Sequence, residues 1–164
     1  MLRPLKRRAP RGNRTRFAIV ASQYNSRFVD SMLKAAQLEL KRGGAQHIRV
    51  VRVPGAFEIP AVASTLAAHS KERPADQAFD ALICFGVIFQ GQTSHAQHIG
   101  WGITHALAQI QVQHQIPVIH AVFVFEKEEH ARVRCLGKKH NRGTEAARTA
   151  LSMARVMKSL GKFP

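Results

Sequence analysis

The stretch "FDALICFGVIFQGQTSHAQH", Phe79–His98, decides the fold expected for this chain. It opens with an apolar run that is typical of a strand buried on both faces of a sheet. We expect this strand to break at Gly86 and Gly91, and a helix to begin at Gln92–His95. N–H groups at such a turn attract anions, and a histidine adds a group that titrates near neutral pH. The turn therefore predicts chemistry on a small anionic substrate, although a plain strand-to-helix turn has the same pattern.

Apolar runs alternate with helical periodicity along the rest of the chain. Strands are expected at 16–21, 47–53, 79–85 and 116–125, helices at 28–40, 59–69, 99–110 and 146–160, and a polar loop at 70–78. This alternation predicts an α/β fold, a three-layer α/β/α sandwich with a four-stranded parallel sheet and helices on both faces. Polar clusters at 22–25, 55–58, 90–95 and after Phe125 then meet at the carboxyl edge of the sheet, where ligands bind in such folds.

The composition limits the possible classes of protein. The chain has 164 residues, of which 45% are hydrophobic, and this suits one domain with a real core. A run of about 20 apolar residues is missing, so no membrane association is expected. Cys84 and Cys135 do not make a disulfide framework; Cys84 is predicted to lie in the core, and a reducing compartment fits. The histidines show no metal-binding spacing.

The positive charge is concentrated at the start of the chain. The formal net charge is +15, and residues 1–16 hold seven basic residues and no acid. We expect a disordered basic tail over 1–15 and one domain over 16–164. A cleaved targeting peptide and a nucleic-acid-binding tail are alternatives. Because the chain has no recognisable nucleic-acid motif, loose, salt-sensitive adhesion is favoured over specific nucleic-acid binding.

Five motifs occur in the order and spacing of one enzyme family. They are "VPGAFEIP" (Val53–Pro60), the pair Tyr24–Asn25, the turn Gly86–His95, "IPVI" (Ile116–Ile119), and the late set Arg134, Lys138, Asn141 and Gly143. Together they cover about residues 16–160, and the chain resembles the lumazine synthase family, which has a flavodoxin-like fold. "VPGAFEIP" is close to the family consensus and is the most specific of the five.

The resemblance implies an enzyme of riboflavin biosynthesis. The family joins 5-amino-6-ribitylamino-uracil to 3,4-dihydroxy-2-butanone 4-phosphate, a transferase reaction that uses no metal or organic cofactor. A cytoplasmic location, small-molecule substrates and riboflavin synthase as a downstream partner follow from the same resemblance. Family active sites lie between neighbouring subunits, so we expect His120, Arg134 and His95 to act on substrate held partly by the next chain's Tyr24 and Glu58.

The pyrimidine and ribityl site is expected to contain nine residues: Tyr24, Asn25, Gly55, Ala56, Phe57, Glu58, Ile88, Phe89 and His120. Tyr24 would stack on the pyrimidine, although a core aromatic is the alternative. Asn25 would bind the pyrimidine edge or shape the loop, or else cap a helix. Glu58 would accept hydrogen bonds from ribityl hydroxyls. The alternative is that it only provides a favourable negative charge in the first turn of a helix. Phe57 is expected to pack, while Ile88 and Phe89 would form the wall of the ring pocket.

Phosphate binding and proton transfer are assigned to a second set of residues. His95 is the expected general acid/base, with a surface histidine as the alternative. Gln92 and Thr93 would hold phosphate through N–H groups and the Thr hydroxyl. Arg134 would clamp phosphate, since a guanidinium matches its oxygens, and Lys138 could assist; a solvated helix charge is the alternative for Arg134.

The chain departs from the family pattern at four polar positions: Gln90, Gln92, Gln97 and His120. These departures keep open a second class of protein, one that binds a flavin or lumazine without converting it. A nucleic-acid-binding domain is a third class, supported by charge alone. The segment "GKKHNRG", Gly137–Gly143, resembles pentameric rather than icosahedral members, because His140 stands where capsid-forming relatives have a glycine. A homopentamer is therefore expected. A decamer made of two such pentamers would also agree with this expectation.

Overall fold

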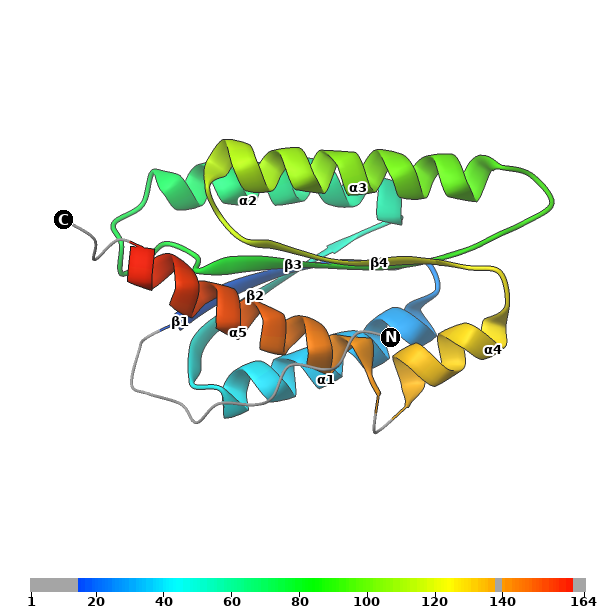
Figure 1. Cartoon of the computed structure of the whole chain (residues 1–164), viewed down its shortest axis with the longest axis horizontal. Coiled ribbons are helices and arrows are strands. Elements are labelled where there is room, and N and C mark those ends of the chain that lie inside the picture. Colours follow the sequence, from blue (N-terminus) through cyan, green and yellow to red (C-terminus); the bar gives the residue numbers. More distant parts are fainter. Residues whose placement is uncertain (1–14, 138–139, 161–164) are drawn as a thin grey trace.

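The computed structural model describes residues 15–137 and 140–160. Four parallel strands form one sheet in the order β2-β1-β3-β4 (Figure 1): β1 Thr15–Ser22, β2 Ala45–Val53, β3 Ala81–Phe89 and β4 Val118–Phe125. The predicted four-stranded parallel sheet is confirmed. The chain adds β2 on one side of β1, and then adds β3 and β4 on the other side. The resulting change of direction lies between β1 and β3, where open α/β sheets bind ligands at their carboxyl edge.

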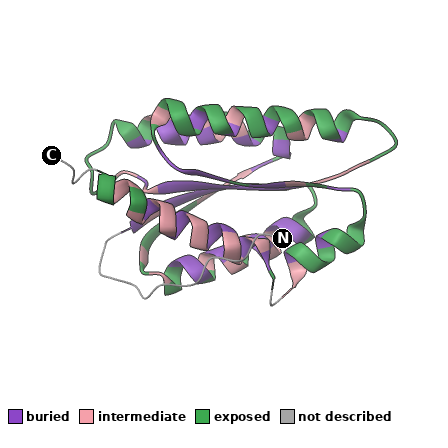
Figure 2. Cartoon of the chain, in the orientation of Figure 1, coloured by how far each residue is buried: buried purple, intermediate pink, exposed green. Residues whose placement is uncertain are grey.

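Helices cover both faces of the sheet, as predicted. On one face α1 (Ser26–Arg42) and α5 (Arg142–Leu160) pack side by side, with the short α4 (Glu128–Ala131) near the carboxyl edge. On the other face lie α2 (Ile59–Lys71) and α3 (His95–His114), preceded by the short 3-10 helix η1 (Ala56–Glu58). The central strands β1 and β3 are therefore buried between two helical layers, while the edge strand β2 keeps exposed residues (Figure 2). None of the helices within the described part of the chain is long and apolar enough to span a membrane.

The central strand β1 shows why the sheet has two cores. Phe17 and Ile19 face the α1/α5 layer, and Ala18 and Val20 face the α2/α3 layer; all are fully buried. A strand covered on both faces needs continuous apolar sequence rather than alternation. Cys84 of β3 is completely buried, as predicted, and this burial raises the pKa of its thiol to about 12.

The predicted break of β3 at Gly86 is wrong. The strand continues to Phe89, and Gly86 pairs with Val122 of β4. A Cβ atom at Gly86 would lie 3.0 Å from Val122 Cγ1 and 3.1 Å from Ala56 Cβ. The glycine thus permits close approach of η1 to the sheet, while the apolar residues after it continue the strand.

Several element boundaries also differ from those predicted. β1 begins at Thr15, which was assigned to the tail but is buried and paired with Ala45 of β2. β4 begins only at Val118, because Pro117 has no N–H group for a ladder. α2 extends to Lys71, so the loop that follows it is shorter than expected. Ser70 is buried there, and its Oγ accepts the Phe79 N–H at 2.7 Å.

The charged segment after Phe125 is helical, which the sequence pattern did not predict. α4 runs directly into a π-helical turn, η2 (Arg132–Leu136), that places Cys135 in the core. Asn141 then fastens this segment to α5. Its Nδ2 donates to the Cys135 carbonyl at 2.6 Å, and its Oδ1 accepts the Gly143 N–H at 2.8 Å. Asn141 is thus a structural residue at the entry of α5.

Candidate functional site

The turn after β1 presents Tyr24 at the carboxyl edge of the sheet. The Tyr24 N–H donates to the Pro54 carbonyl at 3.1 Å, and the side chain is 69% exposed. Asn25 follows with φ 55°, a left-handed conformation that asparagine tolerates. Its Nδ2 donates to the Val87 carbonyl of β3 at 2.7 Å and does not cap α1. Of the roles considered for Asn25, loop shaping is observed and side-chain capping is not.

Gly55 and Glu58 lie directly against Tyr24. The Gly55 N–H donates to Glu58 Oε2 at 2.7 Å, which is half of a capping box at the start of η1. A Cβ atom at Gly55 would lie 2.7 Å from that oxygen and 3.2 Å from Tyr24 Cδ2. The glycine therefore lets the Tyr24 ring and the Glu58 carboxylate approach the backbone, and a larger residue would make both side chains shift. Glu58 is exposed, so it remains accessible from solvent.

The other residues expected around the ring pocket differ in their surroundings. Ala56 is buried against β3, but Phe57 is 63% exposed, so the expectation that Phe57 packs is wrong for the single chain. Ile88 and Phe89 end β3 and point to opposite faces of the sheet. Phe89 packs edge-on against Phe28 with ring centroids 5.6 Å apart. Ile88 therefore lies on the α2/α3 face, and Phe89 belongs to the aromatic packing on the α1/α5 face.

The turn from β3 to α3 is shaped by Gln90. Its backbone N–H donates to the Phe125 carbonyl at 2.8 Å, and its Nε2 donates to the Thr93 carbonyl at 2.7 Å. Gln92, Thr93 and His95 are exposed, and α3 begins at His95 without a side-chain cap from the described residues. Thr93 Oγ1 lies 3.5 Å from the His95 N. The His95 N–H is thus turned toward the Thr93 hydroxyl oxygen, and the exposed turn lies at the amino end of a long helix, where anions are favoured.

His120 on β4 is held by α3. Its Nε2 lies 2.8 Å from Thr104 Oγ1, which itself donates to the Gly100 carbonyl, and its Nδ1 accepts the Val122 N–H at 3.3 Å. The Thr104 hydroxyl has one proton, so His120 must donate from Nε2, and a neutral ring satisfies both contacts. Loss of hydration beside α3 lowers the pKa of His120, and a backbone hydrogen bond partly offsets this effect.

The lowered pKa of His120 predicts a pH-dependent contribution to stability. Between the pKa in the folded chain and the ordinary value of 6.5, the unfolded chain binds more protons, so stability falls as the pH drops through that window. His120→Gln keeps a polar side chain without this titration. We expect urea unfolding at fixed protein concentration to show a smaller loss of stability for the variant than for the wild type on acidification from pH ~7.5 to ~5.5. An equal loss in both proteins contradicts this assignment.

Arg134 lies in a cleft on the other side of β4. It is exposed on η2 and, with Phe123, Val133, Glu129 and His130 among its neighbours, lines a cleft of about 490 Å³. Glu126 and Glu129 also line this cleft, so the charge of Arg134 is outweighed by two carboxylates there. Lys138, the expected assistant of Arg134, lies outside the described residues.

Comparison with known proteins identifies the family. Residues 14–158 match the family model described as 6,7-dimethyl-8-ribityllumazine synthase. The chain belongs to this family. A protein of that name from Pyrococcus furiosus is 34% identical over 152 residues, 93% of this chain and 91% of the relative. Another from Stenotrophomonas maltophilia (strain R551-3) is 34% identical over 147 residues, 88% of this chain and 90% of the relative.

Within this lumazine synthase fold, the expected site residues fall into two groups. The first group comprises Tyr24, Asn25, Gly55, Glu58, Ile88 and the turn Gln90–His95, all at the carboxyl ends of β1, β2 and β3. The second group comprises His120 and Arg134, which lie along and beyond the edge strand β4. β3 separates β4 from β1 in the sheet, so His120 and Arg134 lie on the far side of β3 from Tyr24. The turn of the first group adjoins β4, because the Gln90 N–H donates to the Phe125 carbonyl. His120 and Arg134 themselves lie on opposite faces of β4.

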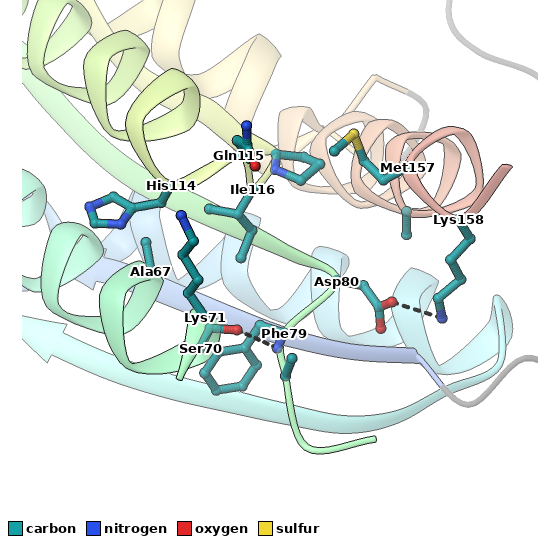
Figure 3. Close-up of a pocket in the computed structure, with 13 residues that line it drawn as sticks. Ala67, Ser70, Lys71, Phe79, Asp80, His114, Gln115, Ile116, Met157 and Lys158 are labelled. Atoms are coloured by element: carbon teal, nitrogen blue, oxygen red, sulfur yellow. Dashed lines mark hydrogen bonds and ion pairs between the residues drawn. The ribbon is translucent and has the colours of Figure 1, made fainter. Parts of the chain in front are cut away.

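A second cavity lies at the opposite edge of the lumazine synthase sheet. Its volume is about 360 Å³, and it is lined by Lys71, His114 and the Asp80–Lys158 ion pair above an apolar floor that includes Phe79 and Ile116 (Figure 3). It adjoins the amino ends of β3 and β4, away from the turns described above. Over residues 15–137 and 140–160, no three His, Cys, Asp or Glu side chains form a group suited to a metal ion.

Sequence reasoning missed three residues that shape the first and second groups. Gln90 is expected only as part of the polar cluster 90–95 and as a departure from the family pattern, yet it holds the Thr93 carbonyl; a polar side chain directly after an apolar strand is a signal that could have suggested this. Thr104 contacts His120 across two elements, and no sequence pattern indicates that contact. Arg52 reaches the end of β1, and a charged residue at an inward-facing strand position is the signal that was available.

Proposed function

We propose that this chain condenses 5-amino-6-ribitylamino-uracil with 3,4-dihydroxy-2-butanone 4-phosphate to give 6,7-dimethyl-8-ribityllumazine, phosphate and water, the penultimate step of riboflavin biosynthesis. The observation that carries the proposal is the contact of Tyr24, Gly55 and Glu58 at the carboxyl edge of a lumazine synthase fold. An exposed aromatic face beside an exposed carboxylate suits a flat pyrimidine that bears a polyhydroxy chain.

The proposed chemistry consists of two carbon–nitrogen condensations, the loss of phosphate, and the proton transfers that these steps require. The pyrimidine amine attacks the ketone carbon, and loss of one water gives an imine. The carbon that bears the hydroxyl group then loses a proton, phosphate leaves with its bonding electron pair, and the resulting enol becomes a ketone. Attack of the second amine on this ketone closes the ring with loss of another water. His95 moves protons between the amine, the carbonyl oxygen and the leaving phosphate, because it stands exposed at the start of α3.

Phosphate binding is proposed at the same turn. α3 begins without a side-chain cap from Ser94, and the Thr93 hydroxyl accepts the His95 N–H at 3.5 Å, so this hydroxyl lies at the amino end of the helix. Gly91 leaves space there, because a Cβ atom at that position would meet nothing within 4 Å. A guanidinium from Arg134 would complete the anion site through charge-assisted hydrogen bonds. Gln92 is exposed beside Thr93 and is assigned the same ligand.

The direct test is product formation from the two substrates by the purified full chain. We expect lumazine absorbance to appear, with release of one phosphate per lumazine, after exhaustive treatment with a chelator. A protein that binds the pyrimidine tightly but never yields lumazine would instead be a flavin- or lumazine-binding member of the family.

We also propose that neighbouring subunits complete the site. His120 and Arg134 lie on or beyond β4, on the far side of β3 from Tyr24, which supports a site that a second copy completes. Large apolar side chains exposed on the single chain support burial between copies: Trp101 is 77% exposed and Val112 is 76% exposed, both on α3. Large exposed apolar residues gathered on one element are typical of an interface.

A pentamer is the proposed assembly. We expect light scattering of the full chain to give a mass near five times 18.2 kDa. A sixty-chain particle would contradict the interpretation of the Gly137–Gly143 segment, part of which lies outside the described residues. A ten-chain particle would keep the pentamer and add a face-to-face contact. Repulsion between basic surfaces predicts that any such larger particle forms more readily at high salt.

The cellular setting follows from the proposed reaction. The product is the substrate of a riboflavin synthase, so such an enzyme is proposed as the downstream partner. A cytoplasmic location is proposed because the thiols of Cys84 and Cys135 are both free and buried, which suits a reducing compartment. No specific nucleic-acid partner is proposed; the basic tail lies outside the described residues.

A further inference from the structure

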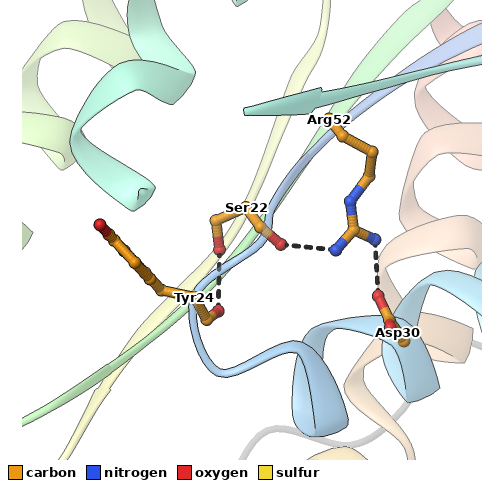
Figure 4. A network of polar contacts seen from close by, with 4 residues as sticks. All are labelled: Ser22, Tyr24, Asp30 and Arg52. Atoms are coloured by element: carbon orange, nitrogen blue, oxygen red, sulfur yellow. Dashed lines mark hydrogen bonds and ion pairs between the residues drawn. The ribbon is translucent and has the colours of Figure 1, made fainter. Parts of the chain in front are cut away.

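Arg52 binds two segments that flank the Tyr24 turn. Its Nη1 donates to Asp30 Oδ1 at 2.6 Å, and its Nη2 donates to the Ser22 carbonyl at 2.9 Å (Figure 4). Ser22 is the last residue of β1, and Asp30 lies in the second turn of α1. The guanidinium of a β2 residue therefore holds the chain on both sides of the segment 23–25.

The segment between these two attachment points must be fixed for the Tyr24 ring to have one position. The N–H groups of Gln23 and Tyr24 donate to the carbonyls of Val53 and Pro54, and Asn25 is in the left-handed region. In Figure 4 the Tyr24 ring points away from Arg52, so the arginine does not touch the expected pyrimidine face. Its influence on that face can only pass through the backbone of the turn.

The two bonds of Arg52 differ in their exposure. Ser22 is fully buried, so the bond to its carbonyl is shielded from water. The Arg52 and Asp30 side chains are 29% and 44% exposed, so their ion pair is partly screened by salt. Loss of the arginine would leave the Ser22 carbonyl buried without this donor, and the turn must move to hydrate it.

We propose that Arg52, with Asp30, is a positioning residue that sets the orientation of the Tyr24 ring for the pyrimidine substrate. The inference rests on the proposed function only in that Tyr24 is taken to bind the pyrimidine. The effect of Arg52 on the position of the Tyr24 ring does not depend on that function. The inference predicts a specific kinetic defect: a ring held in several orientations binds the pyrimidine less well, while proton transfer at His95 is unaffected.

The position of Tyr24 can be measured without any substrate, because the chain has one tyrosine and one tryptophan. In a Trp101→Phe background, tyrosine fluorescence anisotropy and the tyrosine band of the near-ultraviolet circular dichroism report on Tyr24 alone. Arg52→Ala should lower the anisotropy and reduce the band, and Arg52→Lys should restore part of both. Arg49→Ala, which removes an exposed arginine from the same strand, is the matched control and should change neither.

Kinetics then test the consequence for the substrate. Arg52→Ala should raise KM for the pyrimidine by about 3-fold to 10-fold with kcat changed less than about 2-fold, the range for losing one or two charge-assisted hydrogen bonds. Asp30→Asn, which keeps an acceptor oxygen, should give a smaller rise. In a Tyr24→Ala background, Arg52→Ala should add nothing to KM.

The outcomes separate the inference from the proposed function. Unchanged tyrosine signals in Arg52→Ala overturn the inference, even where the variant is less stable. Changed tyrosine signals with an unchanged KM keep Arg52 as a positioning residue for the ring but contradict the role of Tyr24 in pyrimidine binding. Should Arg52→Ala fail to fold, the same comparisons with Arg52→Lys and Asp30→Asn decide the matter, with intermediate shifts in both signals expected.

Discussion

Replacing Gly143 with alanine is expected to destabilise the chain severely. Gly143 lies in the first turn of α5, and a Cβ atom there would lie 1.9 Å from the carbonyl oxygen of Met32 and 2.7 Å from its Cα on α1. Both are backbone atoms inside a helix, so no side-chain rotation relieves the overlap, and α1 and α5 must separate. We expect the free energy of unfolding to fall by about 3 kcal/mol or more, measured by urea unfolding at fixed protein concentration.

Gly102→Ala is the matched control for this prediction. Gly102 also lies in a helix, but a Cβ atom there would meet only Phe57 Cε2 at 3.9 Å, an ordinary contact. Its free energy of unfolding should stay level or rise by about 0.5–1 kcal/mol, because alanine favours helix over glycine. Similar losses of stability in both variants would contradict the close packing of α1 against α5 at Gly143.

His95→Ala should slow turnover by about 10-fold to 100-fold while substrate binding persists. This is at or below the usual range for a positioned acid/base group, because the substrate amine and phosphate can transfer protons themselves. His95 is the first residue of α3 and follows directly on the turn where phosphate binding is proposed. Steady-state and single-turnover rates of lumazine formation measure the effect.

Two comparison variants give this prediction its specificity. His105→Ala removes another exposed histidine of α3, ten positions along the helix, and should leave turnover within about 2-fold. Arg134→Ala should mainly raise KM for the phosphate substrate, because its guanidinium binds the phosphate without transferring protons. If His95→Ala and Arg134→Ala have interchangeable kinetic defects, the roles assigned to the two residues are wrong.

Much of the fold could be predicted from local pattern. The alternation of apolar runs with helical periods predicted the parallel sheet and both helical layers, because a strand covered on both faces requires continuous apolar sequence. The errors occur where tertiary contacts override local signals. Gly86 looked like a strand break but serves close packing of Ala56, and the charged segment after Phe125 gains helix from burial of Cys135.

The candidate site was less predictable than the fold. The clustering of Tyr24, Gly55 and Glu58 follows from the rule that strand ends converge, so their proximity was expected. The roles of Asn25, Gln90 and Arg52 depend on which backbone carbonyl each side chain can reach. Asn25 binds the carbonyl of Val87, Gln90 that of Thr93, and Arg52 that of Ser22. One-dimensional patterns carry no such information. The exposure of Phe57 was missed for a related reason, because the apolar character of a side chain does not show whether another element of the fold covers it.

Subunit complementation tests the central claim, that this chain makes lumazine at a site shared by two copies. Glu58→Ala and Arg134→Ala each damage one group of residues, and a mixed oligomer contains some interfaces where both groups are intact. With equal amounts of the two variants and random assembly in a ring, we predict recovery of about one quarter of the wild-type rate at low substrate concentrations. A mixture no more active than the mean of the two separate variants would contradict the shared site.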